Sequence, residues 1–183
     1  MCPPQANAGT GSQLALGKLT TEHIDEAFNT NVKGTIFTVQ QALPLMGEGG
    51  SIILSGSSAG TTGSPAMTTY SASKAAVRNL ARTWAEDLRG TGIRVNVLSP
   101  GPTATDLAKA ALGEEGVKAF GRANPLQHMA DPAEIGAVAA FLASDDSSKS
   151  LVQDRRQLKS QLIGVAGFMT ASEVAVDGGI AQI

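Results

Sequence analysis

Hydrophobic positions along this chain switch between a helical period and short continuous runs. From about 68 to 89, apolar residues recur every three or four positions, with Val77 and Ala81 on one stripe. The run 51–55 is short, apolar and bounded by glycine, which is typical of a buried parallel strand. The stretch 93–98, which ends at Ser99-Pro100-Gly101, predicts the next strand. Helical stretches that alternate with such strands predict an α/β protein with a parallel sheet.

Capping residues predict where two further helices begin. Thr20 or Thr21 can accept a backbone hydrogen bond as the N-cap of a helical stretch that extends over about 21–46. Asp131 can cap another helix, with Pro132 at the first helical position, where its missing N–H costs nothing. The chain is therefore expected to fold as alternating helices and strands in a single domain, 1–183.

Tyr70 and Lys74 lie four residues apart in the helix expected over 68–89. Residues at this spacing share a helix face, so the phenol and the ammonium can point into one space. A nearby cation favours the phenolate and lowers the pKa of a tyrosine, which can then exchange a proton with an alcohol or a carbonyl. A surface lysine would instead snorkel to solvent, but Lys74 lies on the inward stripe.

Three other polar features accompany this pair. They are Asn31, Ser57 and the turn Pro100-Gly101-Pro102-Thr103-Ala104-Thr105. Asn31 is the polar member of an otherwise apolar helical stripe, and Ser57 follows a predicted strand at its carboxyl end, where ligands bind in open parallel sheets. Each has a structural alternative when taken singly: a helix-kinking asparagine, a capping serine and an ordinary strand-ending turn.

This ordered set resembles the short-chain dehydrogenase/reductase family. Asn7-Ala8-Gly9 and Val176-Asp177-Gly178-Gly179 extend the resemblance, which covers most of residues 7–148 and 168–183. It implies a Rossmann-like, doubly wound parallel sheet. It also implies an oxidoreductase that uses NAD or NADP and interconverts an alcohol and a ketone or aldehyde by hydride transfer.

The resemblance implies roles for individual residues. Tyr70 would be the general acid/base, and Lys74 would lower its pKa and hold the nicotinamide ribose. Ser57 would hydrogen-bond the substrate oxygen, and Asn31 would hold a water that relays protons through Lys74. The implied cofactor-binding residues are Asn7, Ala8, Gly9, Tyr70, Lys74, Pro100, Gly101, Thr103 and Thr105. The glycine-containing segment 106–126 would form a mobile cover over the substrate.

Composition and charge restrict the partners. The chain has 183 residues and a net charge of −2, which gives it no basic footprint for nucleic acid. It has no membrane-length apolar run, no secretory signal and a single cysteine, Cys2, so we expect a cytoplasmic location. His23 and His128 are isolated, and no metal site is expected. The resemblance implies a small-molecule alcohol or carbonyl substrate, and a second copy of the chain contacted through the 21–46 and 68–89 helices.

Two stretches depart from the family pattern. No glycine-rich phosphate-binding string occurs, and residues 1–6 form a poor strand because they contain two prolines. The resemblance therefore covers the carboxyl-terminal half of the fold, with the first βαβαβ half absent, and leaves the choice between NAD and NADP open. The segment 149–167 carries four basic residues and one acidic residue. It is interpreted as a surface insertion or a translated intron, and we favour the intron.

Three functions are compatible with this sequence. The first is an active oxidoreductase. The second is a catalytically inactive fragment or pseudoenzyme that lacks the dinucleotide-binding half, and the third is a non-enzymatic binding module. The presence of Ser57, Tyr70 and Lys74 together argues against the third, because a scaffold needs no such set.

The absent half leads to a prediction about solubility. Strand 51–55 would become an open edge that is apolar on both faces, and some helices would expose apolar surface. We therefore expect the chain, expressed alone, to be poorly soluble or molten. Size-exclusion chromatography and thermal unfolding test this, and a cooperative transition in a monodisperse sample would contradict it.

Overall fold

A four-stranded parallel sheet forms the centre of the structure, a computed structural model that describes residues 5–144 and 169–182. Its strands, in spatial order, are β1 (Gln5–Ala6), β2 (Ser51–Ser55), β3 (Arg94–Pro100) and β4 (Glu173–Val176). The α-helices are α1 (Thr21–Phe28), α2 (Gly34–Ala42), α3 (Thr68–Asp87), α4 (Asp106–Gly121) and α5 (Pro132–Ala143). The predicted parallel α/β fold is confirmed. The insertion predicted at 149–167 lies outside the described residues.

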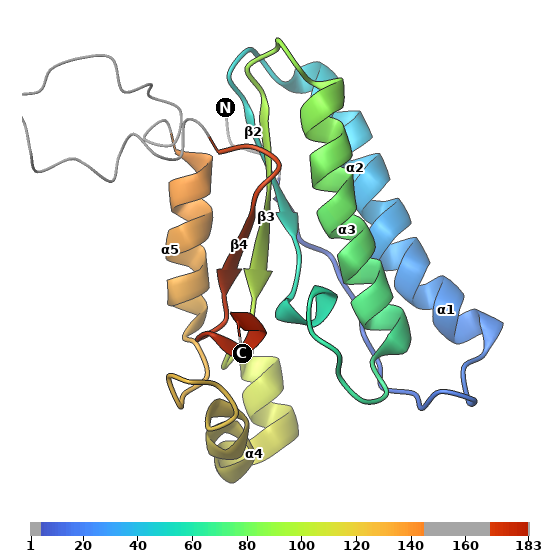
Figure 1. Cartoon of the computed structure of the whole chain (residues 1–183), viewed down its shortest axis with the longest axis vertical. Helices are drawn as coiled ribbons and strands as arrows, with labels where there is room; N and C mark the ends of the chain where they lie inside the picture. The colour runs from blue at the N-terminus through green and yellow to red at the C-terminus, as the bar shows by residue number, and fades with distance from the viewer. Residues whose placement is uncertain (1–4, 145–168, 183) are drawn as a thin grey trace, which may run out of the picture.

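Helices cover both faces of the sheet (Figure 1). On one face lie α1, α2 and α3, and α5 lies on the other. The strands are parallel, so their carboxyl ends point to one end of the molecule, where α4 and the carboxyl-terminal turn also lie. This end is where ligands bind in open parallel sheets.

The core lies in two layers on either side of β2 and β3. The cluster that includes α2 and α3 contains Ala6, Val39, Ile52, Leu54, Val77, Ala81, Val95 and Val97. The cluster that includes α5 contains Ile53, Leu98 and Leu142. Alternate residues of β2 thus face opposite layers, which is why the strand is apolar throughout.

Two polar side chains inside β3 hold neighbouring elements in place. Asn96 donates from Nδ2 to the carbonyl of Met169 (2.9 Å) and accepts from the backbone N–H of Ser172 (3.2 Å), just before β4. Arg94 donates to the carbonyl of Leu142 (3.0 Å), in the last turn of α5. Helix carbonyls at this end have no intrahelical partner, so the buried guanidinium satisfies one of them.

The predicted open edge at 51–55 is wrong for part of the strand. Gln5 pairs with Ile53, and Ala6 pairs with Leu54, both in parallel. The reason is that β1 continues the sheet beyond β2, although it is only two residues long. Ala6 is buried against β2, so the amino-terminal stretch contributes to the core.

Apolar side chains remain exposed on α1 and along the segment that follows it. Of the stripe predicted around Asn31, Ala27 is buried, but Ile24 and Phe28 are 40% and 36% exposed. Phe37 and Leu45 are exposed as well. None of the described helices combines the length and the hydropathy that a membrane crossing requires.

Gly56, directly after β2, provides a test of this packing. A Cβ at position 56 would lie 2.6 Å from Cγ1 of Val97 and would also overlap the hydroxyl of Ser99. Because both neighbours are buried, we expect Gly56→Ala to lower the free energy of unfolding by about 1–3 kcal/mol. Urea unfolding monitored by the fluorescence of Trp84 measures this.

The matched control is Gly63→Ala, because a Cβ at Gly63 meets no atom within 4 Å. Equal effects of the two substitutions would contradict the close approach of the ends of β2 and β3.

Candidate active site

Lys74 lies in the second turn of α3 and points inward. Its side chain is buried, with 5% of the residue exposed, and its ammonium donates to the carbonyl of Ser55 (2.9 Å) at the end of β2. Desolvation by this burial lowers the pKa of Lys74. The snorkelling alternative is therefore wrong, and the inward position predicted from the helical stripe is confirmed.

Tyr70 lies one helical turn before Lys74 and shares a space with it. The ammonium of Lys74 is 5.7 Å from the centroid of the Tyr70 ring. Gly11 packs against the ring, since a Cβ at Gly11 would lie 2.5 Å from Cδ2 of Tyr70. The loop around Gly11 thus packs directly on the ring.

Asn31 lies in a π-helical segment, Asn29–Lys33, between α1 and α2, and is 1% exposed. Its amide forms a two-way pair with the backbone of Thr10: Oδ1 accepts from the Thr10 N–H, and Nδ2 donates to the Thr10 carbonyl, both at 2.8 Å. Nδ2 also donates to Ser73 (2.9 Å), whose hydroxyl donates to the Tyr70 carbonyl (2.7 Å). Asn31 therefore links the loop around Thr10 to α3, and both hydrogens of its amide are engaged within the chain.

The Asn7-Ala8-Gly9 segment borders Lys74. Ser55, whose carbonyl binds Lys74, donates from its hydroxyl to Oδ1 of Asn7 (2.8 Å). A Cβ at Gly9 would lie 3.3 Å from Nζ of Lys74 and 3.5 Å from Oδ1 of Asn31. The absence of a side chain at Gly9 thus keeps space open beside the ammonium.

Ser57 caps a short 3-10 turn, η3 (Ser58–Gly60), that follows β2. Its hydroxyl oxygen accepts from the backbone N–H of Ala59 (3.2 Å), as the structural alternative predicts. The turn lies against α3, because a Cβ at Gly60 would be 3.1 Å from the carbonyl carbon of Lys74. The structure thus gives Ser57 a capping role in a turn that packs on the backbone of α3.

The predicted cofactor turn lies at the end of β3 and packs on the turn after β4. A Cβ at Gly101 would lie 2.6 Å from Cα of Asp177, so only glycine fits there without displacement. Thr103 donates to the Gly101 carbonyl (3.0 Å), and Thr105 accepts from Ala108 as the N-cap of α4 (3.2 Å). Both threonine hydroxyls thus have local partners.

The predicted mobile segment 106–126 is mostly helical. It contains α4, in which Gly113 breaks the helical geometry with φ 66° and ψ 175°. Glycine tolerates this positive φ at little cost, so the break falls where the sequence permits it. Mobility of the segment stays a prediction.

The two histidines contact polar groups of the chain. His23 lies between the hydroxyls of Ser12 (3.2 Å) and Thr69 (2.9 Å). His128 lines a cavity of about 70 Å³ beside Asp177. In the part of the chain that the structure describes, no three His, Cys, Asp or Glu side chains gather as a metal-binding group.

Sequence reasoning missed three residues of this site: Thr10, Gly11 and Ser73. Ser73 could have been found, because it lies three residues after Tyr70 on the inward side of the same helix. Thr10 acts through its backbone, so its residue type carries no signal. Gly11 acts by lacking a side chain where Tyr70 packs.

The arrangement around the Lys74 ammonium fits the binding of a sugar ring with free hydroxyls, such as a ribose, next to Tyr70. One N–H of the Lys74 ammonium is donated to Ser55, and the space that Gly9 leaves open borders the same ammonium. The two remaining N–H groups can bind hydroxyls such as those of a ribose. The residues present therefore fit a nicotinamide nucleotide at this end of the sheet.

Comparison with known sequences relates the chain to a protein family. A family model described as Enoyl-(Acyl carrier protein) reductase matches residues 5–153. Oxidoreductase asL5 of Sarocladium schorii is 59% identical over 180 residues, covering 97% of this chain and 65% of that protein. The 3-oxoacyl-[acyl-carrier-protein] reductase FabG of Thermotoga maritima is 35% identical over 163 residues, with 88% of this chain and 63% of that protein covered.

Solved structures agree with these sequence matches. The angucycline C-6 ketoreductase LanV, solved with bound NADP, superimposes with a TM-score of 0.80 and is 29% identical. The match covers 98% of this chain and 62% of that one. The chain thus spans less than two thirds of the length of these relatives.

The burial of Lys74 predicts a pH dependence of stability. Its pKa is lowered in the folded chain, so the unfolded chain binds more protons between that value and the ordinary lysine pKa of about 10.4. Lys74 therefore makes stability rise with pH across this window. Below the lowered pKa both states are protonated, and Lys74 adds no slope. We expect Lys74→Met to remove this rise, as measured by urea unfolding between pH 7 and 10.

The matched control is Lys109→Met, at an exposed lysine on α4. An equal change of slope in both variants would contradict the assignment of the rise to burial of the Lys74 ammonium.

Proposed function

The chain belongs to the short-chain dehydrogenase/reductase family, and we propose that it interconverts an alcohol and a ketone or aldehyde with NAD or NADP. The observation that carries this proposal is the buried Lys74 ammonium beside the Tyr70 ring, at the carboxyl end of the sheet. Burying a cation costs free energy unless an opposite charge or several hydrogen bonds compensate it. In the described site the Lys74 ammonium donates one hydrogen bond, to the Ser55 carbonyl. A buried charge that is only partly compensated is typical of a functional site.

Tyr70 is the proposed proton donor and acceptor. In the reducing direction its hydroxyl gives a proton to the substrate oxygen, which becomes an alcohol, and the proton is then recovered from solvent. When bound, the reduced nicotinamide supplies the hydride that the carbonyl carbon receives. In the oxidising direction Tyr70 takes the proton back from the alcohol.

Ser57 is the proposed second contact to the substrate oxygen. Its oxygen already accepts from Ala59, so its own O–H remains to be donated. A donor fixed in this way stabilises negative charge that develops on the oxygen during reduction. The cap thus orients the hydroxyl and leaves its hydrogen available.

The proposed cofactor-binding groups include Lys74 and the turn after β3. Asn31 is proposed to take part in the proton relay. Lys74 donates to the ribose from an ammonium that lies 5.7 Å from the centroid of the Tyr70 ring. Asn7, Ala8 and Gly9 border the same space, and the stretch from Pro100 to Thr105 binds the carboxamide end. Asn31 fixes the loop around Thr10, which borders Lys74. Both hydrogens of the Asn31 amide are engaged, so Asn31 would hold the proposed relay water by accepting a hydrogen bond at an oxygen atom.

A second copy of the chain is the proposed macromolecular partner. The exposed apolar residues Phe28 and Phe37 lie on α1 and α2, which lie beside α3 in the structure (Figure 1). These are the helices for which the contact is predicted. A cytoplasmic location also stays a prediction.

Cofactor titration is the first test of this function. We expect NADH or NADPH fluorescence to change saturably on addition of the full chain. The absence of saturable binding to either nucleotide would favour the inactive-fragment alternative.

Tyr70→Phe is the sharper test. It removes one hydroxyl and keeps the ring that packs on Gly11, so folding and nucleotide binding should stay nearly unchanged. We expect turnover of a panel of small ketones and aldehydes to fall by about 10²–10⁴-fold. A fully active Tyr70→Phe variant would refute the proposed mechanism.

A further inference from the structure

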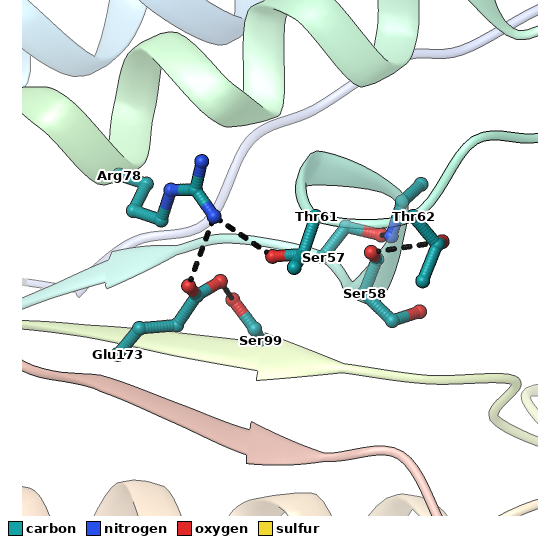
Figure 2. A network of polar contacts seen from close by, with 8 residues as sticks. Ser57, Ser58, Thr61, Thr62, Arg78, Ser99 and Glu173 are labelled. Carbon is teal, nitrogen blue, oxygen red and sulfur yellow. Dashed lines mark hydrogen bonds and ion pairs between the residues drawn. The ribbon is translucent and has the colours of Figure 1, made fainter. Parts of the chain in front are cut away.

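An ion pair outside the proposed catalytic residues connects the turn 57–62, called here the Ser57 turn, to the end of β3 and the start of β4 (Figure 2). Arg78 projects from α3 and contacts Thr61, which follows η3, and Glu173 of β4. Glu173 in turn contacts Ser99, near the end of β3. These four residues come from four different segments, and Glu173 is the first residue of β4, whereas Ser99 lies one residue before the end of β3.

The contacts give the guanidinium a defined orientation. Nη1 of Arg78 donates to the hydroxyl oxygen of Thr61 at 2.9 Å and lies 3.5 Å from Oε2 of Glu173. The other carboxylate oxygen, Oε1, accepts from the hydroxyl of Ser99 at 2.7 Å. The hydrogen bond from Ser99 thereby fixes the Glu173 carboxylate relative to β3. The carboxylate in turn holds the Arg78 guanidinium against Thr61.

Arg78 lies on the same helix face as the proposed catalytic pair. Tyr70, Lys74 and Arg78 follow one another at intervals of four residues. One face of α3 thus carries the proposed proton donor, the proposed ribose ligand and the cation that binds the Ser57 turn.

The turn transmits the restraint at Thr61 to Ser57. Its backbone is bonded internally, from the Gly60 N–H to the Ser57 carbonyl (2.9 Å) and from the Thr61 N–H to the Ser58 carbonyl (3.0 Å). Thr62 adds two bonds to the same Ser58 carbonyl, from its N–H (3.0 Å) and its hydroxyl (3.1 Å). Because these bonds close the turn on itself, a displacement of Thr61 moves Ser57 with it.

We propose that Arg78 and Glu173 are positioning residues for Ser57, which hold its hydroxyl at the distance from Tyr70 that the substrate oxygen requires. This inference rests on the proposed function of Ser57 and Tyr70. The pair acts at both borders of the site, since Thr61 belongs to the Ser57 turn and Ser99 precedes the Pro100-Gly101 turn.

Stability alone does not account for the pair. The side chains of Arg78 and Glu173 are 27% and 22% exposed, and Thr61 is exposed. Ion pairs with this access to water contribute little to stability. The turn is already packed on α3 through Gly60, so the added contact at Thr61 fixes orientation. Small displacements of a reacting group cost rate far more than they cost stability.

The test compares Arg78→Met with Arg82→Met, an exposed arginine one turn later on α3. We expect Arg78→Met to lower kcat about 10–100-fold with little change in the KM for the nucleotide, and Arg78→Lys to restore part of it. Arg82→Met should leave kcat unchanged. If both variants lose activity equally, or neither does, the proposal is wrong.

A double-mutant cycle asks whether Arg78 acts through Ser57. If it does, adding Arg78→Met to Ser57→Ala produces little further loss of kcat, because the group to be positioned is already gone. Fully additive losses would overturn the proposal. Thermal unfolding of all variants, run in parallel, identifies any loss that reflects unfolding.

Hydrogen exchange provides a readout that does not depend on turnover. We expect the amides of 57–62 to exchange faster in Arg78→Met than in the wild type or in Arg82→Met, and unchanged exchange would overturn the proposal. If the wild-type chain shows neither nucleotide binding nor turnover, the proposed function fails, and the exchange result still decides whether Arg78 restrains the turn.

Discussion

The burial of one ammonium group is the constraint on which the rest of the site depends. Lys74 occupies a position on α3 that would otherwise belong to the core, and its charge must find a polar partner where β2 ends. The carbonyl of Ser55 is such a partner because it lies at the carboxyl end of the strand. Ligands bind outside the carboxyl ends of the strands in open parallel sheets, so the contact with Ser55 places the ammonium at the ligand-binding end of the sheet.

Glycine makes this crowded arrangement possible. Gly9 borders the ammonium, Gly11 the tyrosine ring, and Gly60 the backbone of α3, while Gly56 and Gly101 lie where strand ends meet their neighbours. In each case a single methyl group would lie within about 3.3 Å of an atom already present. The site is assembled by bringing backbones together, and the few side chains that remain are those with a polar partner or a proposed chemical role.

Elements with a local physical cause could be predicted from the sequence. The apolar run 51–55 predicts β2 with the observed bounds. Asp131 caps α5, and its own backbone N–H donates in return to the carboxylate of Glu134. Lys74 lies inward as its helical stripe indicates. Contacts between distant segments could not be predicted in this way. The pairing of β1 with β2 depends on register between remote segments, and the partner of Arg78 is a carboxylate far along the chain.

The pair between Asn31 and Thr10 determines what sequence variation at this site can reveal. Asn31 binds the backbone N–H and carbonyl of residue 10 and not its side chain, so most amino acids at position 10 would preserve both hydrogen bonds. Proline is the exception, because it lacks the N–H that Oδ1 accepts. A position that drifts freely among relatives can therefore be indispensable for the geometry of Lys74 and Tyr70. Selection at position 10 would then appear only as the absence of proline, and a comparison that counts identical residues does not detect this.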